Sequence, residues 1–313
     1  MSMIEVENLT RRFGPVTAVA GLSLAVARGE VLGFLGPNGA GKSTTMKMIT
    51  GYLAPDSGTA RICGHDIGTD RLAAQKTIGY LPEGAPAYGE MTPRQFLSFI
   101  ARVRGFSGAE AKRRIESAVE KTQLQSVMTR AIESLSKGFK RRVGLAQAIL
   151  HDPAVLIMDE PTDGLDPNQK HAVRELIRGM AAEKAIIVST HLLEEVEAIC
   201  TRAVIIDRGV IVADGTPAEL LARSRFHNAV TLTLGETDRE RASAKLKSLP
   251  LVAGIEQDGA RLTLFPKSGA LLIEQVSALA VSEKWDVKEL YAEPGRLDEV
   301  FRAITTQDTV RAA

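Results

Sequence analysis

GPNGAGKST, at residues 36–44, is the stretch that decides the fold of this protein. It fits the pattern G-x-x-x-x-G-K-[S/T] in full. Two glycines, a lysine and a serine fill the fixed positions: Gly36, Gly41, Lys42 and Ser43. An apolar run, VLGFLG, leads into it at residues 31–36, and an amphipathic segment follows at residues 42–50 before Gly51. Strand, glycine-rich turn and helix in this order predict a phosphate-binding loop.

The loop has the chemistry that nucleotide phosphates require. Glycines let backbone N–H groups curl around phosphate oxygens, and the N-terminus of the following helix adds partial positive charge. We expect Lys42 to reach the β- and γ-phosphates and the hydroxyl of Ser43 to hold Mg²⁺. The predicted nucleotide-binding residues of the loop are Gly36, Pro37, Asn38, Gly39, Ala40, Gly41, Lys42, Ser43 and Thr44.

A second apolar run ends in two acids. AVLIMD, at residues 154–159, is followed by Glu160, so Asp159 and Glu160 stand at the end of a buried strand. An aspartate there can hold Mg²⁺ through water. Glu160 is then placed to accept a proton from an attacking water, or to orient that water. Two solvated strand-end carboxylates are the alternative, but the phosphate loop supplies a reason for the pair.

Composition bounds the class of protein. The chain has 313 residues, 44% hydrophobic and 25% charged, as in a soluble globular protein of two domains. A net charge of +1 gives no whole-protein field that indicates nucleic acid. No apolar run approaches the ~20 residues that span a bilayer, and the N-terminus lacks the apolar core of a signal peptide. Cys63 and Cys200 carry no paired motif, which favours reduced thiols in a cytosolic protein.

The pattern of apolar runs predicts an α/β fold with a mixed sheet. The first 30 residues alternate like antiparallel strands. Near-continuous apolar runs predict parallel strands covered on both faces by helices, at residues 31–36, 154–159, 185–190 and 203–207. DRGVIVADG, at residues 207–215, predicts a hairpin at the sheet edge. The sequence of residues from about 90 to 150 predicts a helical subdomain. One helix is expected to start at Thr92-Pro93, and a capping box formed by Ser107 and Glu110 is expected to start the next.

A second domain is expected at residues 226–313, after a first domain at residues 1–222. Apolar alternation predicts strands near residues 228–234, 252–257, 261–265 and 285–290. Helical patterns at residues 240–249 and 269–282 separate them. The order β-α-β-β-α-β is typical of a small α+β domain of the ferredoxin-like kind.

Further motifs resemble those of ABC transporter ATPases, and the resemblance covers residues 1 to about 220. ESLSKGFKRRVGLAQAIL followed by HDPAVLIMDEPTDGLDP, at residues 133–167, is similar to the signature-to-Walker-B region of that family. The signature is LSKGF, in which Lys137 replaces the usual second glycine and Phe139 the frequent glutamine. Ser136 and Gly138 are retained. The resemblance implies that Ser136 and Gly138 present a hydroxyl and a backbone N–H to the γ-phosphate of ATP bound to the other subunit. Lys137 adds a cation near that phosphate, so all three are predicted nucleotide-binding residues.

Three more positions match the family residue by residue. Asp166, in GLD at residues 164–166, resembles the D-loop aspartate at the subunit boundary. His191, at the end of the run AIIVST, resembles the switch histidine that contacts the γ-phosphate and the catalytic water. Phe13 resembles the aromatic residue that stacks on adenine, with a core phenylalanine as the alternative. Lys42, Glu160 and His191 are thus the predicted catalytic residues, and ATP and Mg²⁺ the predicted cofactors.

Glu83 occupies the position of the family's Q-loop, which normally holds glutamine. It stands in IGYLPEGAP, where a short apolar run breaks into a loop rich in proline and glycine. The resemblance implies contact with Mg²⁺ and the attacking water, and a carboxylate is at least as good a ligand for Mg²⁺ as an amide oxygen. The predicted metal ligands are therefore Ser43, Glu83 and Asp159.

The resemblance implies the ATPase subunit of an exporter, similar to the type-2 drug-export and gliding-type ATPases. With one cassette in the chain, we expect a homo- or heterodimer of ATPase subunits that drives a separate transmembrane permease. The location implied is cytoplasmic, peripheral at the inner face of the membrane through that permease. The end of the chain, AEPGRLDEVFRAIT, resembles the type-2 C-terminal extension. This extension regulates, stabilises the dimer, or is passive.

Two other classes of function stay open as alternatives. One is a soluble ABC ATPase that drives assembly or mechanical work, on nucleic acid or ribosomes, without transport. One cassette, no coiled-coil insertion and no basic stripe argue against it, and we expect no direct nucleic-acid contact. The other is a different P-loop enzyme such as a kinase, which would leave the signature and His191 unexplained.

Overall fold

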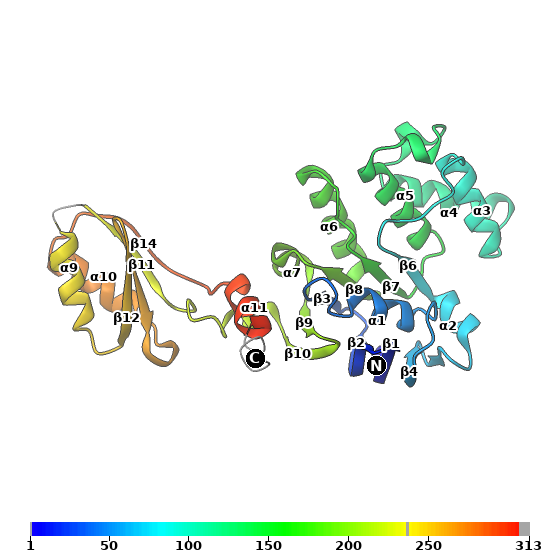
Figure 1. The fold of residues 1–313 in the computed structure, drawn as a ribbon. Coiled ribbons are helices and arrows are strands. Elements are labelled where there is room, and N and C mark those ends of the chain that lie inside the picture. The colour runs from blue at the N-terminus through cyan, green and yellow to red at the C-terminus, as the bar shows by residue number, and fades with distance from the viewer. Residues whose placement is uncertain (1, 236–237, 307–313) are drawn as a thin grey trace. The chain divides into compact units, whose positions relative to one another are not determined.

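The computed structural model describes residues 2–235 and 238–306. The chain divides into two compact units between Pro217 and Ala218, where the sequence led us to expect a division after residue 222. The expected second domain also includes residues 307–313, which lie outside the described ranges. Figure 1 shows the elements of both units.

A mixed sheet with strand order β10-β9-β3-β8-β7-β6 forms the centre of the first unit. Its strands are β3 (Val31–Leu35), β6 (Ile78–Leu81), β7 (Val155–Asp159), β8 (Ala185–Thr190), β9 (Arg202–Asp207) and β10 (Val210–Gly215). β6, β7, β8, β3 and β9 are parallel neighbours, and β10 returns antiparallel to β9. Every residue of β3, β7 and β8 is buried, as the continuous apolar runs predict. The predicted parallel sheet and edge hairpin are confirmed.

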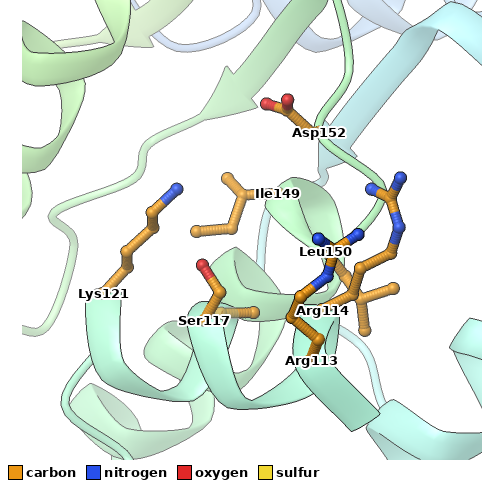
Figure 2. Close-up of a pocket in the computed structure, with 8 residues that line it drawn as sticks. Arg113, Arg114, Ser117, Lys121, Ile149, Leu150 and Asp152 are labelled. Atoms are coloured by element: carbon orange, nitrogen blue, oxygen red, sulfur yellow. The ribbon is translucent and has the colours of Figure 1, made fainter. Parts of the chain in front are cut away.

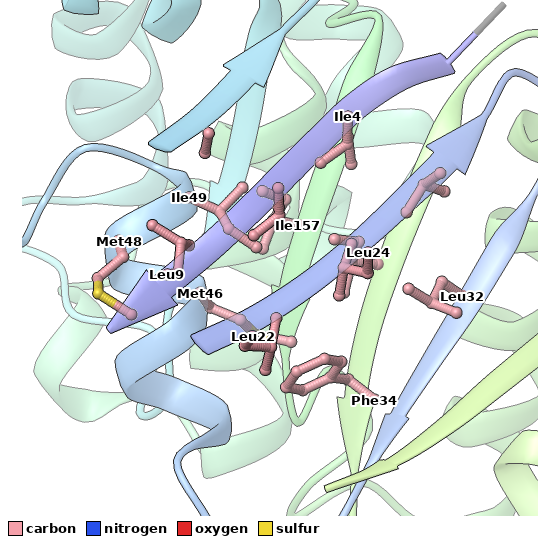
Figure 3. Packing of buried hydrophobic residues seen from close by; sticks show 14 of the residues in the cluster. Ile4, Leu9, Leu22, Leu24, Leu32, Phe34, Met46, Met48, Ile49 and Ile157 are labelled. Carbon is pink, nitrogen blue, oxygen red and sulfur yellow. The ribbon is translucent and has the colours of Figure 1, made fainter. Parts of the chain in front are cut away.

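An antiparallel sheet with order β2-β1-β4-β5 contains the first described strand. Its strands are β1 (Ser2–Phe13), β2 (Val16–Ala27), β4 (Ser57–Ile62) and β5 (His65–Asp66). One apolar core joins this sheet to the central sheet and to helix α1 (Lys42–Ile49), as Figure 3 shows. Leu9, Leu32 and Met46 in this core are fully buried. The core thus fixes the start of α1 against both sheets.

The first unit contains the remaining helices α2 (Arg71–Thr77), α3 (Pro93–Val103), α4 (Gly108–Lys121), α5 (Lys137–Ile149), α6 (Pro167–Ala181) and α7 (Leu193–Ile199). Short 3₁₀ turns, η1 (Gln125–Val127) and η2 (Ile132–Ser134), precede α5. α3 starts as predicted, because Gln95 N donates to Thr92 Oγ1 and Thr92 N donates to Gln95 Oε1. The second predicted capping box is wrong. The Ser107 side chain makes no capping bond to α4, because the chain enters that helix through Gly108 with a φ of 55°.

The second unit has the predicted order of a ferredoxin-like domain. Its elements are β11 (Val230–Leu234), α9 (Arg239–Lys247), β12 (Val252–Asp258), β13 (Arg261–Pro266), η3 (Lys267–Gly269), α10 (Ile273–Ser282) and β14 (Val287–Ala292). The sheet order is β12-β13-β11-β14, and neighbouring strands are antiparallel. Leu232, Leu246, Val276 and Trp285 belong to its own apolar core. α8 (Pro217–Leu221) begins at the division between the units, and α11 (Leu297–Thr306) follows the sheet.

Candidate active site

The carboxyl ends of three parallel strands bring the predicted site residues to one edge of the sheet. β3 runs into the phosphate loop, β7 ends at Asp159, and β8 ends at Thr190 just before His191. The register pairs Leu35 with Thr190 and Asp159 with Ser189, so the three strand ends are level. Open α/β sheets bind their ligands at this edge.

The phosphate loop has the tight backbone that its glycines predict. Gly41 has a φ of 106°, and a Cβ there would lie 2.4 Å from the backbone oxygen of Ala18. At Gly36, a Cβ would lie 2.5 Å from the backbone oxygen of Ile206. No side chain forms a capping hydrogen bond at the start of α1. Its first backbone N–H groups can therefore bind an anion.

Lys42 lies across the loop that precedes it. Its Nζ donates to the backbone oxygens of Gly36, at 2.6 Å, and Pro37, at 3.1 Å. Burial lowers the pKa of the Lys42 ammonium from its usual 10.5, while the charges of Glu160, Asp159 and Glu83 act in the opposite direction. These acids therefore favour a cation beside the phosphate-binding backbone.

Asp159 is buried with one oxygen free. Its side chain is 1% exposed, and its Oδ1 accepts a hydrogen bond from Ser189 Oγ. Its Oδ2 has no hydrogen-bond partner among the described residues. A buried carboxylate oxygen without a partner is costly unless a cation or ordered water completes it. The orphaned oxygen thus fits a role beside a metal ion.

Glu160 adopts an unusual backbone conformation directly after Asp159. Its φ is 53°, in the left-handed region that non-glycine residues rarely enter. Its N–H donates to the backbone oxygen of Ser189 at 3.1 Å, with Ser189 Oγ at 3.2 Å. The side chain then meets His191, whose Nδ1 lies 2.8 Å from Glu160 Oε2. Burial raises the pKa of the Glu160 carboxyl, and the His191 hydrogen bond partly offsets that rise.

One cavity of about 310 Å³ joins the phosphate loop to the predicted acids. Its lining consists of Ala18, Asn38, Gly39, Gly41, Lys42, Ser43, Thr44, Glu83, Asp159 and Glu160. Glu83, which stands in the loop after β6, therefore faces the same space as Lys42 and the two strand-end acids. Within residues 2–235 and 238–306, no cluster of three acids, histidines or cysteines is arranged to hold a metal by itself. Such a set agrees with Mg²⁺, which usually keeps waters and binds substrate phosphates with one or two carboxylates.

The signature residues and Asp166 gather at a different place in the same unit. Ser136 is the N-cap of α5, and its Oγ accepts from Phe139 N at 3.4 Å. Asp166 is the N-cap of α6, and its Oδ1 accepts from Gln169 N at 2.9 Å. A Cβ on Gly138 would lie 2.5 Å from Gln169 Oε1, so the two helix starts are neighbours. None of these residues lines the 310 Å³ cavity.

Phe13 lies at the end of β1 and is 48% exposed. The guanidinium of Arg11 sits 5.0 Å from the ring centroid. Such exposure excludes the alternative of a core phenylalanine. An exposed aromatic ring offers a flat apolar face for stacking.

Arg141 is not among the site residues predicted from the sequence. It is 4% exposed, and its guanidinium hydrogen-bonds the backbone oxygens of Pro82, Asp159 and Glu160. A signal for this burial exists in the helical spacing. Gly138, Arg141 and Leu145 follow each other at three and four residues and share one buried face of α5.

A separate cavity of about 290 Å³ lies between α4 and the end of α5, as Figure 2 shows. It is lined by Arg113, Arg114, Ser117, Ala118, Lys121, Ile149, Leu150 and Asp152. Part of its charge is already paired. Arg114 Nε donates to Glu110 at 3.0 Å, and Lys184 Nζ donates to Asp152 at 2.6 Å. None of the predicted nucleotide-binding residues lines this cavity.

Comparison with known proteins identifies the family. The sequence pattern of the family described as "ABC transporter" matches residues 19–163. The "Nod factor export ATP-binding protein I" of Paraburkholderia xenovorans (strain LB400) is 35% identical over 306 residues, which cover 97% of both chains. This chain belongs to the ABC transporter ATP-binding proteins. The "Linearmycin resistance ATP-binding protein LnrL" of Bacillus subtilis (strain 168) is 37% identical over 233 residues, covering 74% of this chain and 75% of that protein.

Solved structures agree with the family assignment. A chain described as "Structure of ATP binding subunit of ABC transporter" superposes with a TM-score of 0.65 at 32% identity, covering 70% of this chain and 92% of that chain. The predicted ABC ATPase fold and the resemblance to exporter ATPases are therefore confirmed. This ABC protein binds and hydrolyses ATP as the ATP-binding subunit of a transporter. Within the described residues, no helix is long and apolar enough to cross a membrane.

Proposed function

We propose that this ABC ATPase powers export through a separate transmembrane permease by pairing with a second ATPase subunit around ATP. One observation carries the proposal. The 310 Å³ cavity holds the phosphate loop and the acids, whereas Ser136 and Gly138 lie outside it at the start of α5. The start of a helix that retains the signature residues suits phosphate binding. Because these residues lie outside this chain's own cavity, the ATP that they would contact is bound to a paired subunit. The partner subunit is a second copy of this chain or a related cassette.

The proposed chemistry uses the residues around that cavity. The first N–H groups of α1 and the ammonium of Lys42 hold the β- and γ-phosphates of ATP. Lys42 leaves the carbonyls of Gly36 and Pro37 for the phosphates. A water oxygen attacks the γ-phosphorus, the bond from that phosphorus to the bridging oxygen breaks, and ADP leaves with the bond's electrons. Glu160 takes the proton of the water, and His191 holds the Glu160 side chain in position at 2.8 Å.

Mg²⁺ fits the donor set of this cavity. Ser43, Glu83 and Asp159 would hold it, directly or through water, since all three line the cavity and Asp159 Oδ2 has no hydrogen-bond partner among the described residues. When bound, the ion neutralises charge on the β- and γ-phosphate oxygens. Phe13 would stack on adenine, and Asp166 and Lys137 would lie at the subunit boundary beside the paired ATP.

A groove of about 680 Å³ is the proposed docking site of the permease. β6, α2 and α3 contribute to its walls. Tyr52, Leu72 and Val103 in its lining are 78%, 74% and 67% exposed, which is unusual for large apolar side chains. Ile78 and Tyr80 line its floor from β6, the strand that leads into the Glu83 loop. Docking there would place the protein in the cytoplasm, peripheral at the inner face of the membrane.

Coexpression with the membrane proteins encoded beside this gene tests the proposal. Leu72→Asp and Val103→Asp should reduce copurification of a permease at least tenfold, because each puts a charge into the groove. Leu271→Asp is the matched control, since Leu271 is 67% exposed in the second unit, far along the chain from the groove. Equal copurification of all three variants would contradict the assigned groove. A protein that hydrolyses ATP but copurifies with no membrane protein would favour the soluble mechanical ATPase.

The second unit is proposed to regulate the ATPase or to stabilise its dimer. Its own apolar core supports independent folding. Removal of residues 226–313 should leave ATP binding intact and change the dimerisation constant or the ATPase rate. An unchanged constant and rate would make the unit a passive stabilising domain.

A further inference from the structure

Arg141 is a buried cation, and among residues 2–235 and 238–306 no carboxylate forms an ion pair with it. It lies on α5 one helical turn after the signature, and its guanidinium donates hydrogen bonds to three backbone carbonyls. Nη1 donates to Pro82 O at 3.2 Å, and Nη2 donates to Asp159 O at 3.1 Å and to Glu160 O. These carbonyls belong to two segments that are more than 70 residues apart in the sequence.

The two segments are those that carry the cavity's acids. Pro82 immediately precedes Glu83, and the other two carbonyls belong to Asp159 and Glu160 themselves. Glu160 needs support from both sides, because its φ of 53° is strained for a residue with a side chain. Its N–H is held by Ser189 on β8, and its carbonyl is held by Arg141 on α5.

We infer that Arg141 is a positioning residue, which fixes Glu83 and Glu160 relative to each other across the cavity. The inference rests on the roles proposed for those two acids and goes beyond them. Arg141 does not line the cavity and touches no reacting atom, so it acts through the backbone of the residues that do.

The geometry requires a guanidinium. Burial lowers the pKa of Arg141 from its usual 12.5, and four nearby acids oppose that shift: Asp163, Asp159, Glu160 and Glu83. An arginine keeps its charge under these conditions and spreads its donors over a planar fork. Lysine retains the charge but presents it at a single point, which cannot span carbonyls from two segments. Glutamine retains a hydrogen-bond donor and loses the charge.

Steady-state kinetics of Arg141→Gln and Arg141→Lys in the full chain test the inference. We expect kcat to fall ~10- to 100-fold in both variants, because small displacements of reacting groups cost rates of this size. The Kd for ATP should stay within about twofold, since neither the phosphate loop nor α1 is touched. In the Arg141→Gln background, Glu83→Ala should have little further effect on kcat, whereas it lowers kcat in the wild type.

Arg142→Gln is the matched control. Arg142 is the next residue of α5, is 8% exposed, donates to Gln123 O at 3.2 Å and stacks on Phe139. Thermal denaturation measures how much folded protein this variant loses. The loss of kcat that accompanies it is the loss that a purely structural change on α5 causes. Arg141 variants must lose kcat beyond that loss.

Four results would overturn the inference. Full activity of Arg141→Lys would show that charge alone suffices, and additive effects of Arg141→Gln and Glu83→Ala would show that the two positions act independently. A Kd for ATP that rises by the same factor as kcat falls would make Arg141 a binding residue. Glu160→Gln separates this inference from the proposed chemistry. If Glu160→Gln is inactive and Arg141→Gln is normal, the positioning role alone is wrong, whereas full activity of Glu160→Gln removes the proposed chemistry.

Discussion

Replacing Glu160 with glutamine removes the carboxylate and keeps its shape. The side chain lies at the end of β7 with only 14% of its surface exposed, so the amide occupies the same space. Its carbonyl oxygen can still accept a hydrogen bond from His191 Nδ1, 2.8 Å from the present Oε2. The substitution therefore isolates one property, which is the ability to take a proton from water.

The expected loss of activity follows from that property. A positioned general base contributes about 10²- to 10⁴-fold to a rate, or roughly 3 to 5 kcal/mol of the activation free energy. In the proposed function ATP binds to the phosphate loop and Lys42, which the substitution does not touch. We expect kcat to fall by at least about 100-fold while ATP still binds, so the variant should accumulate as an ATP-bound dimer.

The same substitution should not destabilise the fold. Burial raises the folded-state pKa of the Glu160 carboxyl above its usual 4.5. Because the folded state holds this proton more tightly than the unfolded state, the free energy of unfolding decreases as pH rises from the unfolded-state pKa to the folded-state pKa. The decrease persists at every pH above both values. Glutamine causes no such decrease. Glu160→Gln should therefore be as stable as the wild type near neutral pH, or more stable, and this advantage should vanish in acid.

Phosphate release at saturating ATP and Mg²⁺ measures the rate, and gel filtration with ATP measures the dimer. Glu116→Gln is a suitable control, because Glu116 is an exposed acid on α4. Its ion-pair partner is Lys112, whose Nζ lies 3.9 Å from Glu116 Oε1. This variant should retain full activity. Hydrolysis by Glu160→Gln at the wild-type rate would refute the assignment of Glu160 as the base.

Four further predictions concern the same cavity. Lys42→Ala should weaken ATP binding at least about tenfold, because charge-assisted hydrogen bonds to phosphate are lost; unchanged affinity in a fluorescence titration would count against the phosphate-loop assignment. Glu83→Gln should keep ATPase activity and Glu83→Ala should lose Mg²⁺-dependent stimulation; an Ala variant as active as the wild type excludes Glu83 as a metal ligand. The ATPase rate should fall in acid with a midpoint pH above 4.5, because the pKa of Glu160 is raised and its carboxylate therefore takes up a proton at a higher pH than an ordinary glutamate. A midpoint at the usual glutamate value would contradict this. Gly41→Ala should destabilise the fold by about 1 to 3 kcal/mol in thermal unfolding, owing to its φ of 106° and the contact with Ala18; an unchanged melting temperature would show that the loop relaxes.

Local signals in the sequence were strong enough to predict which residues meet at one edge of the sheet. The phosphate loop, the Asp159-Glu160 pair and the buried strands each have a residue pattern that few other structures require. Their meeting follows from a rule, since parallel strands end at one edge. The second unit was also predictable in element order, because its strands and helices alternate with clear periods.

Contacts between distant segments were not predictable in the same way. Arg141 looks like a solvated cation beside Lys140 and Arg142. Its helical spacing places it on the same face of α5 as Gly138 and Leu145, but the three carbonyls that it bonds belong to segments distant in the sequence. Ser107 has the residue type of a cap, but the conformation of Gly108 turns the chain so that no capping bond forms. Both outcomes depend on backbone geometry that residue type alone does not specify.

α5 has a consequence for how two ATP molecules would be hydrolysed. Its first turn carries Ser136 and Gly138, which the proposed dimer turns toward the partner's nucleotide, and its next turn carries Arg141, bonded to the carbonyl of this chain's own Glu160. About 6 Å of rigid helix separates the two. Movement of one nucleotide would thus be transmitted to the base that acts on the other. Two such helices, related by the dimer axis, would make the pair of hydrolysis events cooperative, with a Hill coefficient for ATP above one.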